Sequence, residues 1–254
     1  MAHALTVLGR LRSVGGARPR RAAAIVAAVS DRRPDPSLAE TVKPVLRGWV
    51  HAGAFPLSAV AGTVLVVLSP AGAPRAATAV FALTAVLLFG TSALYHRGTW
   101  SPRSALLLKR LDHSNIFLII AGTYTPFAVL LLPEDSARTL LVVVWAGALA
   151  GVAFRVLWTG APRWLYVPVY LAMGWIAVAY LPAFWRSGGP AVALLVIAGG
   201  LLYSAGALVY GFRRPDPSPR WFGFHEVFHV LTVVAFFAHY TGVSLAALSG
   251  GSSA

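Results

Sequence analysis

The stretch GFHEVFHVLTVVAFFAHYTGVSLAA, residues 223–247, decides the fold of this chain. It is apolar enough and long enough to cross a bilayer, which takes about 20 predominantly apolar residues in an α-helix. Its first turns nonetheless carry His225 and His229, and ionisable side chains inside a membrane cost free energy and usually mark function. Residues four apart share one helix face, so the two imidazoles can coordinate one metal ion. The stretch therefore predicts a membrane-spanning helix with a functional site near its start.

Six further apolar stretches precede this one, and all have the length of a spanning helix rather than of a barrel strand of about ten residues. The chain has 254 residues, of which 57% are hydrophobic and 11% charged, whereas average soluble chains are about 25% charged. The stretches lie at 50–69, 76–96, 112–132, 139–158, 165–184 and 190–211. Because lipid offers no partner to backbone amides, spanning segments must be helical. The sequence thus predicts an all-α membrane protein, a seven-transmembrane helical bundle.

The basic residues predict the orientation of this bundle. Of the 21 Lys and Arg residues, 18 fall before the first span or after the second, fourth and sixth, with Arg155 and Arg163 assigned to the loop after the fourth. The other side has only Arg75, Arg138 and Arg186. By the positive-inside rule the N-terminus is cytoplasmic and the C-terminus is outside. Clustering in loops also argues against nucleic acid as a partner, despite a net charge of +13.

Three regions follow from these patterns. Residues 1–48 are basic and lack a long apolar run, which predicts a flexible cytoplasmic tail or, alternatively, a surface helix attracted to anionic lipid. Residues 49–248 form the transmembrane domain, and 249–254 form a short polar tail. The chain has no cysteine, so disulfides, thiolate metal sites and thiol nucleophiles are excluded.

Topology brings four polar side chains to one depth. His96 ends the second predicted span, Asp112 begins the third, and His225 and His229 begin the seventh. With the predicted orientation, all four lie near the cytoplasmic face. Three histidines with one open position are a common arrangement of catalytic zinc. A nearby carboxylate can orient a water molecule at the open position or take its proton.

Each of these residues also has an alternative interpretation. Ser92 lies one turn before His96 and can donate to a substrate carbonyl, or it can be a small packing residue. His96 can be an interfacial residue, and Asp112 can pair with Arg110 or cap its helix. Glu226 completes an HExxH-like string that matches the zincin motif. Within a membrane helix we interpret it as an interface or supporting residue rather than a protease base.

The remaining histidines are weaker candidates. His51 begins the first span and is interpreted as interfacial, while His113 points about 100° away from Asp112 and either supports the site or packs. His239 follows His229 by ten residues, or about 15 Å of continuous helix. Because zinc–nitrogen bonds are about 2 Å long, His239 cannot share the same metal.

Motifs spread over residues 44–247 resemble the hemolysin III family, the bacterial branch of the progestin and adipoQ receptors, which include the adiponectin receptors. The motifs are Arg47-Gly48-Trp49, Ser92-Ala93-Leu94-Tyr95-His96, Arg110-Leu111-Asp112-His113-Ser114, Ala121-Gly122-Thr123-Tyr124-Thr125-Pro126 and His225-Glu226-Val227-Phe228-His229. The combination of SxxxH, Asp and HxxxH is a specific signal of this family. The resemblance implies seven helices in a bacterial plasma membrane, with an intramembrane zinc on the cytoplasmic side.

The resemblance also implies roles for the candidate residues. His96, His225 and His229 would be zinc ligands, Asp112 would hold the zinc-bound water, and Ser92 would supply a hydroxyl. The wider superfamily includes alkaline ceramidases, so hydrolysis of a lipid amide or ester, linked to membrane lipid homeostasis, is the implied activity. A membrane lipid would then be the substrate or ligand. The alternatives are a non-enzymatic zinc-containing sensor or receptor and a hemolysin-type lytic protein; the sequence leaves the oligomeric state open.

The charge pattern generates a topology prediction. A reporter fused before Met1 should read as cytoplasmic and one fused after Ala254 as external, because the basic residues favour one side so strongly. Paired fluorescent and periplasmic enzyme reporters measure this. Both ends on the same side would mean an even number of spans and would contradict the shared depth of the polar residues.

Overall fold

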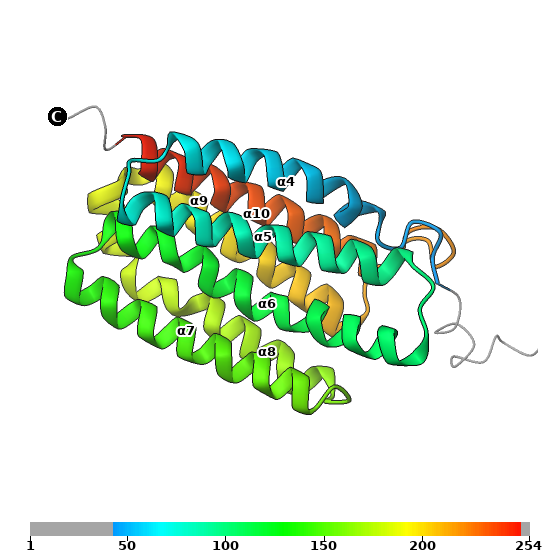
Figure 1. The fold of residues 1–254 in the computed structure, drawn as a ribbon. Coiled ribbons are helices and arrows are strands. Elements are labelled where there is room, and N and C mark those ends of the chain that lie inside the picture. The colour runs from blue at the N-terminus through cyan, green and yellow to red at the C-terminus, as the bar shows by residue number, and fades with distance from the viewer. Residues whose placement is uncertain (1–42, 250–254) are drawn as a thin grey trace, which may run out of the picture. The chain divides into compact units, whose positions relative to one another are not determined.

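The computed structural model describes residues 43–249, so the two predicted tails lie almost wholly outside the described residues. Within that range the structure is helical, apart from one isolated β-bridge between Ser218 and Phe222. The helices are α4 (Trp49–Leu68), α5 (Ala73–Arg97), α6 (Pro102–Leu131), α7 (Glu134–Leu157), α8 (Arg163–Gly174), the 3-10 helix η2 (Trp175–Tyr180), α9 (Leu181–Phe212) and α10 (Phe224–Ser249). They lie side by side as one bundle (Figure 1).

Six segments of the described range have the length and apolarity to cross a membrane. The fifth, Arg163–Phe212, is 50 residues long and contains α8, η2 and α9. Its backbone leaves helical geometry at Gly189, whose φ of 78° favours glycine. The Tyr166 and Tyr210 hydroxyls lie 3.1 Å apart across the two arms of this segment. The segment therefore doubles back on itself and covers the two predicted spans 165–184 and 190–211.

α6 and α7 each begin well before the predicted bound. α6 begins at Pro102 rather than 112, because Ser101 caps it by accepting from the Ser104 N–H at 3.3 Å and proline suits the first helical position. Asp112 therefore lies inside a helix, and its interpretation as a helix cap was wrong. α7 begins at Glu134 rather than 139, and Asp135 lies in its first turn, where an acidic side chain complements the helix dipole.

The predicted helix 165–184 is interrupted. α8 ends at Gly174, and η2 follows before the α-helical geometry resumes in α9. The Tyr124 hydroxyl of α6 stabilises this break: it donates to the Gly174 carbonyl at 2.7 Å and accepts from the Ala177 N–H at 2.7 Å. The side chain thus satisfies backbone groups that an interruption leaves without partners in an apolar medium.

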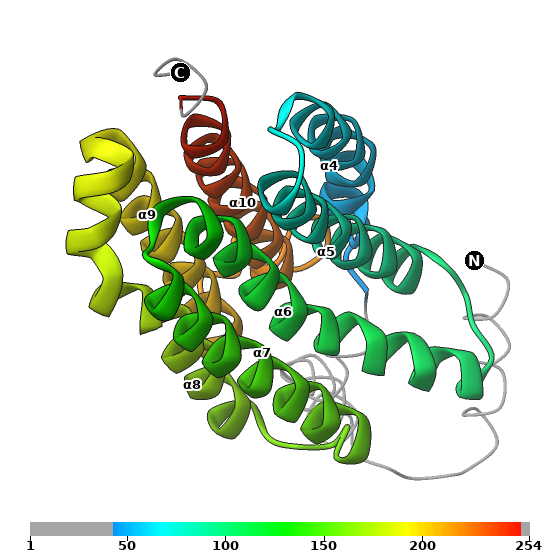
Figure 2. The same ribbon diagram turned by 60° about the vertical axis from the view of Figure 1, so that its left-hand side comes forward.

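α6 is the most buried of the candidate spans and packs against α5, α7, α8, α9 and α10. In Figure 2 it runs between α5 and α7. Small residues permit close approach of the helices: a Cβ at Gly122 would lie 2.1 Å from the Thr84 hydroxyl, and one at Gly151 would lie 2.4 Å from the Phe117 ring. The outer faces carry exposed aliphatic side chains such as Leu57, as expected of a surface in contact with lipid.

Arg155 corrects the charge assignment made from the sequence. It was placed in a loop, but it lies in the last turn of α7 and is 1% exposed. Its Nη2 contacts Nδ1 of His113, and its guanidinium lies 4.4 Å from the centre of the Tyr166 ring. An aromatic face attracts a cation, so these neighbours partly compensate the burial of the charge.

Candidate metal centre and its cavity

Three histidines from two helices meet in one cluster. His96 ends α5, while His225 and His229 lie on one face of the first turns of α10. One ring nitrogen of each lies within 4.8 Å of the others, and the Nε2 atoms of His96 and His225 are 3.2 Å apart. His96 and His229 are buried, and His225 is partly buried. Topology thus brings together the residues that the sequence pattern singled out, here called the histidine cluster.

The segment before α4 closes the cluster from one side. The Val45 and Leu46 N–H groups donate to the carbonyls of Arg220 and Trp221, which ties this segment to the loop ahead of α10. Gly48 then passes directly over α5: its φ is 83°, and a Cβ there would lie 2.8 Å from the His96 Cβ. Only glycine meets both conditions without strain.

Glu226 holds the start of α10 in place. It is fully buried, pairs with Arg47 and accepts from the Gly223 N–H at 2.8 Å. A buried carboxylate needs such partners. Both of its oxygens are thereby occupied, and this supports the interpretation of Glu226 as an interface residue rather than a base.

Asp112 and Ser92 lie next to the cluster. An Asp112 carboxylate oxygen is 3.6 Å from the His96 Nε2, and Ser92 and Asp112 both line the cavity beside the cluster. Both residues are buried. The alternative ion pair with Arg110 is not formed, since Arg110 donates from Nε to the Thr159 hydroxyl at 3.0 Å.

His51 was missed by the sequence reasoning. It was interpreted as interfacial, yet it is 2% exposed, and its ring stacks on that of His229 with centroids 3.7 Å apart and an interplanar angle of 13°. The edge of Phe89 packs against it, 5.1 Å between centroids. A position at the start of a span resembles an interfacial residue in the sequence, because the rings that pack against His51 belong to residues remote in the chain.

The cluster has the chemistry and spacing of a metal site. Zinc bonds of about 2.0–2.1 Å at the tetrahedral angle place two nitrogens about 3.4 Å apart, close to the 3.2 Å between His96 and His225. Imidazoles suit zinc, copper, iron and nickel. The His229 Nδ1 is buried without a hydrogen-bond partner among the described residues, which leaves it available to an ion or a water molecule. The residues therefore fit a transition metal, whose identity the geometry leaves open.

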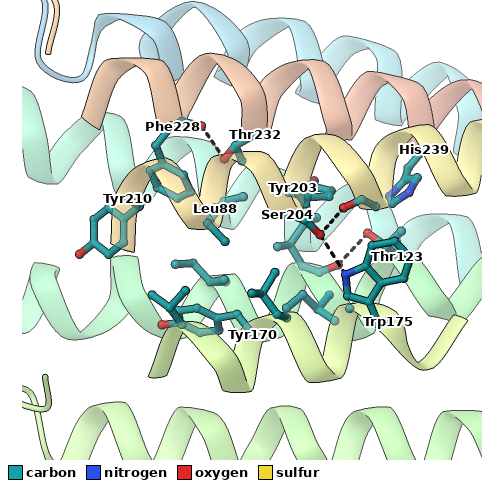
Figure 3. A pocket seen from close by; sticks show the side chains of 18 of the residues that line it. Leu88, Thr123, Tyr170, Trp175, Tyr203, Ser204, Tyr210, Phe228, Thr232 and His239 are labelled. Atoms are coloured by element: carbon teal, nitrogen blue, oxygen red, sulfur yellow. Dashed lines mark hydrogen bonds between the residues drawn. The ribbon is translucent and has the colours of Figure 1, made fainter. Parts of the chain in front are cut away.

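A cavity of about 140 Å³ extends from the histidine cluster into the bundle. Asp112, Ser92, His225 and His229 line it, and so does His239. Figure 3 shows it lengthwise, with Tyr210 and Phe228 toward one end and Trp175 and His239 toward the other. Most of the lining between the ends is aliphatic or aromatic, as is usual for sites that bind apolar ligands.

The fold and this site define the class of the molecule: a multi-pass helical membrane protein with a buried three-histidine cluster that opens into an apolar cavity. The family model described as "Haemolysin-III related" matches residues 39–240, and the chain belongs to this family.

Proteins of bacteria and of eukaryotes with related names are similar in sequence to this chain. The chain is 35% identical over 146 residues to "Hemolysin-3 homolog" of Bacillus subtilis (strain 168), covering 57% of this chain and 68% of that protein. It is 36% identical over 136 residues to "Hemolysin-3" of Bacillus cereus, covering 53% of this chain and 61% of that protein. "Heptahelical transmembrane protein ADIPOR2" of Oryza sativa subsp. japonica is 30% identical over 190 residues, 68% of this chain and 83% of that protein. The resemblance read from the motifs is thereby confirmed.

The cluster generates a prediction about metal content. Alanine at His96, His225 or His229 should each strongly reduce the metal bound by purified protein, because each change removes one of three nitrogen donors. His239→Ala is the matched control: it removes a buried histidine of the same helix that lies outside the cluster. Elemental analysis gives the stoichiometry and identity of the metal. Full retention in all three cluster variants would rule out the site.

The stacked His51 ring generates a second prediction. His51→Ala should weaken metal binding by about 10- to 100-fold, the range seen when a residue that orients a ligand is lost, since the His229 ring loses the surface it stacks on. His51→Phe keeps a ring and should stay near the parent affinity. Competition with a metal chelator measures both. If the phenylalanine variant fell as far as the alanine variant, the nitrogens of His51, and not its stacking, would be what the site needs.

Proposed function

We propose that this protein is a zinc-dependent hydrolase of a membrane lipid amide or ester, working within the membrane near its cytoplasmic face and linked to membrane lipid homeostasis. The proposal includes seven crossings, with the doubled segment Arg163–Phe212 supplying two of them and the N-terminus in the cytoplasm. The observation that carries it is the placement of the Asp112 carboxylate and the Ser92 hydroxyl beside three histidines at one end of an apolar cavity.

Zinc held by His96, His225 and His229 would supply a Lewis acid that polarises a carbonyl and makes water a better nucleophile near neutral pH. The chain's own groups would do the rest. The Asp112 carboxylate, close to the His96 Nε2, is placed to orient a water molecule and accept its proton. The Ser92 hydroxyl is placed to donate a hydrogen bond to the carbonyl oxygen of the substrate. Glu226 contacts Arg47 and the Gly223 N–H, and these contacts fix the first turn of α10, which carries His225.

The cavity supports a lipid as the substrate. Its apolar lining suits an acyl chain, and its polar end coincides with the histidine cluster. A lipid already resides in the membrane and can present its amide or ester bond to a buried site, whereas a water-soluble substrate would have to lose its hydration first. The relatives described above are named hemolysins and a heptahelical transmembrane protein. The hydrolase proposal rests on the arrangement of this chain's residues.

A non-enzymatic sensor or receptor is the second candidate, and one observation favours it. Asp112 lies close enough to His96 for its carboxylate to close the fourth position around a metal. A site with four protein ligands and no open position is structural rather than catalytic. The third alternative, a hemolysin-type lytic protein, rests on the names of the family and of two relatives.

Asp112→Asn separates the two candidates. In a hydrolase the variant should keep its zinc and lose about 10²- to 10⁴-fold in rate, because it loses a general base without changing shape. The measurements are release of fatty acid from ceramides and simpler acyl lipids in nanodiscs, and zinc content. Asp135→Asn, an exposed residue of α7, is the matched control and should behave like the parent.

Two other results would contradict the hydrolase or the role given to Asp112. Loss of zinc in Asp112→Asn, with no lipid turned over by the fully loaded parent, would support the closed site of a sensor. Undiminished turnover in Asp112→Asn would contradict the role given to this carboxylate.

A further inference from the structure

The end of the cavity remote from the histidine cluster carries polar groups that the proposed reaction does not use. His239 lies ten residues beyond His229 on α10, about 15 Å along a continuous helix. Its side chain and that of Tyr203 on α9 both line the cavity. Their rings are neighbours, with centroids 5.6 Å apart, and Figure 3 shows both side chains beside the cavity.

The hydrogen bonding of His239 determines what it can still bind. Its Nε2 lies 3.1 Å from the Val196 carbonyl oxygen, and a carbonyl only accepts, so Nε2 carries the proton. In a neutral imidazole the other nitrogen is then an acceptor. This Nδ1 is buried and has no hydrogen-bond partner among the described residues. His239 therefore offers one unused acceptor.

Tyr203 offers the complementary group. Its hydroxyl is also buried without a partner in the described part of the chain, and a phenol can both donate and accept. The ring of His239 has little freedom to turn away, because it rests on the backbone of α9: a Cβ at Gly199 would lie 2.3 Å from it. Two buried polar atoms without partners are costly, and a bound polar group relieves that cost.

We propose that His239 and Tyr203 form a second subsite, which binds a hydroxyl group on the acyl chain of a lipid. A ligand hydroxyl can donate to the His239 Nδ1 and accept from the Tyr203 hydroxyl, so one group satisfies both atoms. The distance fixes its position on the chain: carbon–carbon bonds of about 1.5 Å advance an extended chain about 1.25 Å per bond, so about twelve bonds span the roughly 15 Å to the histidine cluster.

This proposal rests on the proposed function to the extent that an acyl chain occupies the cavity. It goes further by naming the substrate class: lipids whose acyl chain is hydroxylated about twelve carbons from the polar head. The competing explanation is internal, namely that a small rotation lets Tyr203 donate directly to His239. In that case the two atoms satisfy each other and a ligand hydroxyl gains nothing.

The test compares two probes that differ only in the terminal hydroxyl, dodecanoic acid and ω-hydroxydodecanoic acid. Binding to the full chain in nanodiscs is measured by titration, and the ratio of the two dissociation constants is compared between variants, so that different partitioning of the probes into lipid cancels. From the parent to Tyr203→Phe, the preference for the hydroxylated probe should fall about tenfold, as expected for the loss of a buried hydrogen bond. His239→Phe should remove the same preference.

Tyr240→Phe is the matched control. It deletes a phenolic hydroxyl from the residue after His239, but that hydroxyl donates to the Ala61 carbonyl at 3.0 Å and its side chain does not line the cavity. The preference should stay at the parent value. Since Tyr203→Phe only deletes one atom, it keeps the test decisive even where His239→Phe fails to fold.

Two results would overturn the subsite, and they differ in what else they imply. Saturable binding of both probes, with the same ratio in the parent and in Tyr203→Phe, would contradict the subsite alone and favour the internal pair. No saturable binding of either probe would contradict both the subsite and the acyl-lipid substrate of the proposed function.

Discussion

The cost of placing ionisable side chains in an apolar medium constrains this structure more than any other interaction. In a membrane such groups need partners from other helices, because neither lipid nor their own helix supplies them. The polar side chains of this bundle accordingly occur in groups. Glu226 pairs with Arg47, His113 contacts Arg155, and the histidine cluster joins α5 to α10. Each group ties together segments that lie far apart in the chain.

The same constraint explains why the segment before α4 belongs to the site. Without Arg47, the buried carboxylate of Glu226 would lack its cationic partner, and one missing partner of a buried pair is strongly destabilising. Without Gly48, the segment could not approach His96 so closely. A short stretch outside any spanning helix thus positions the first turn of α10, and with it His225 and His229. The positions of these two histidines depend on this contact as much as on the helices themselves.

Much of this arrangement was predictable from the sequence, for a physical reason. A spanning helix must be apolar over about 20 residues, so the elements can be located by composition, and an ionisable residue inside one is conspicuous. The connection of His96 with His225 and His229 followed from counting spans. The bounds were less predictable where a helix extends beyond its apolar part. α6 begins at Pro102, well before the apolar stretch, because a cap and a proline start a helix whatever the polarity of its first turns.

Other features depend on contacts that no local pattern encodes. The interruption between α8 and α9 is stabilised by Tyr124, which lies about fifty residues earlier in the chain. His51 looked interfacial because its ring packs against His229 and Phe89, which belong to other helices. Arg155 looked like a loop charge because it stands near the end of an apolar stretch. In each case the decisive partner is remote in sequence, so only the packed bundle reveals it.

Arg155 affects the electrostatic potential at one end of the cavity. The guanidinium is buried with its Nε and Nη1 lacking hydrogen-bond partners among the described residues, and its neighbours Tyr166 and His113 line the cavity. A positive charge held there raises the electrostatic potential at the end of the cavity where Asp112 lies, and low polarity strengthens that effect. The Asp112 carboxylate offsets part of this potential, so the charged groups of the lining gather at that end, while His239, Tyr203 and Ser204 line the far end. For the lipid substrate that we propose, this charge favours an orientation with the polar head toward the histidine cluster.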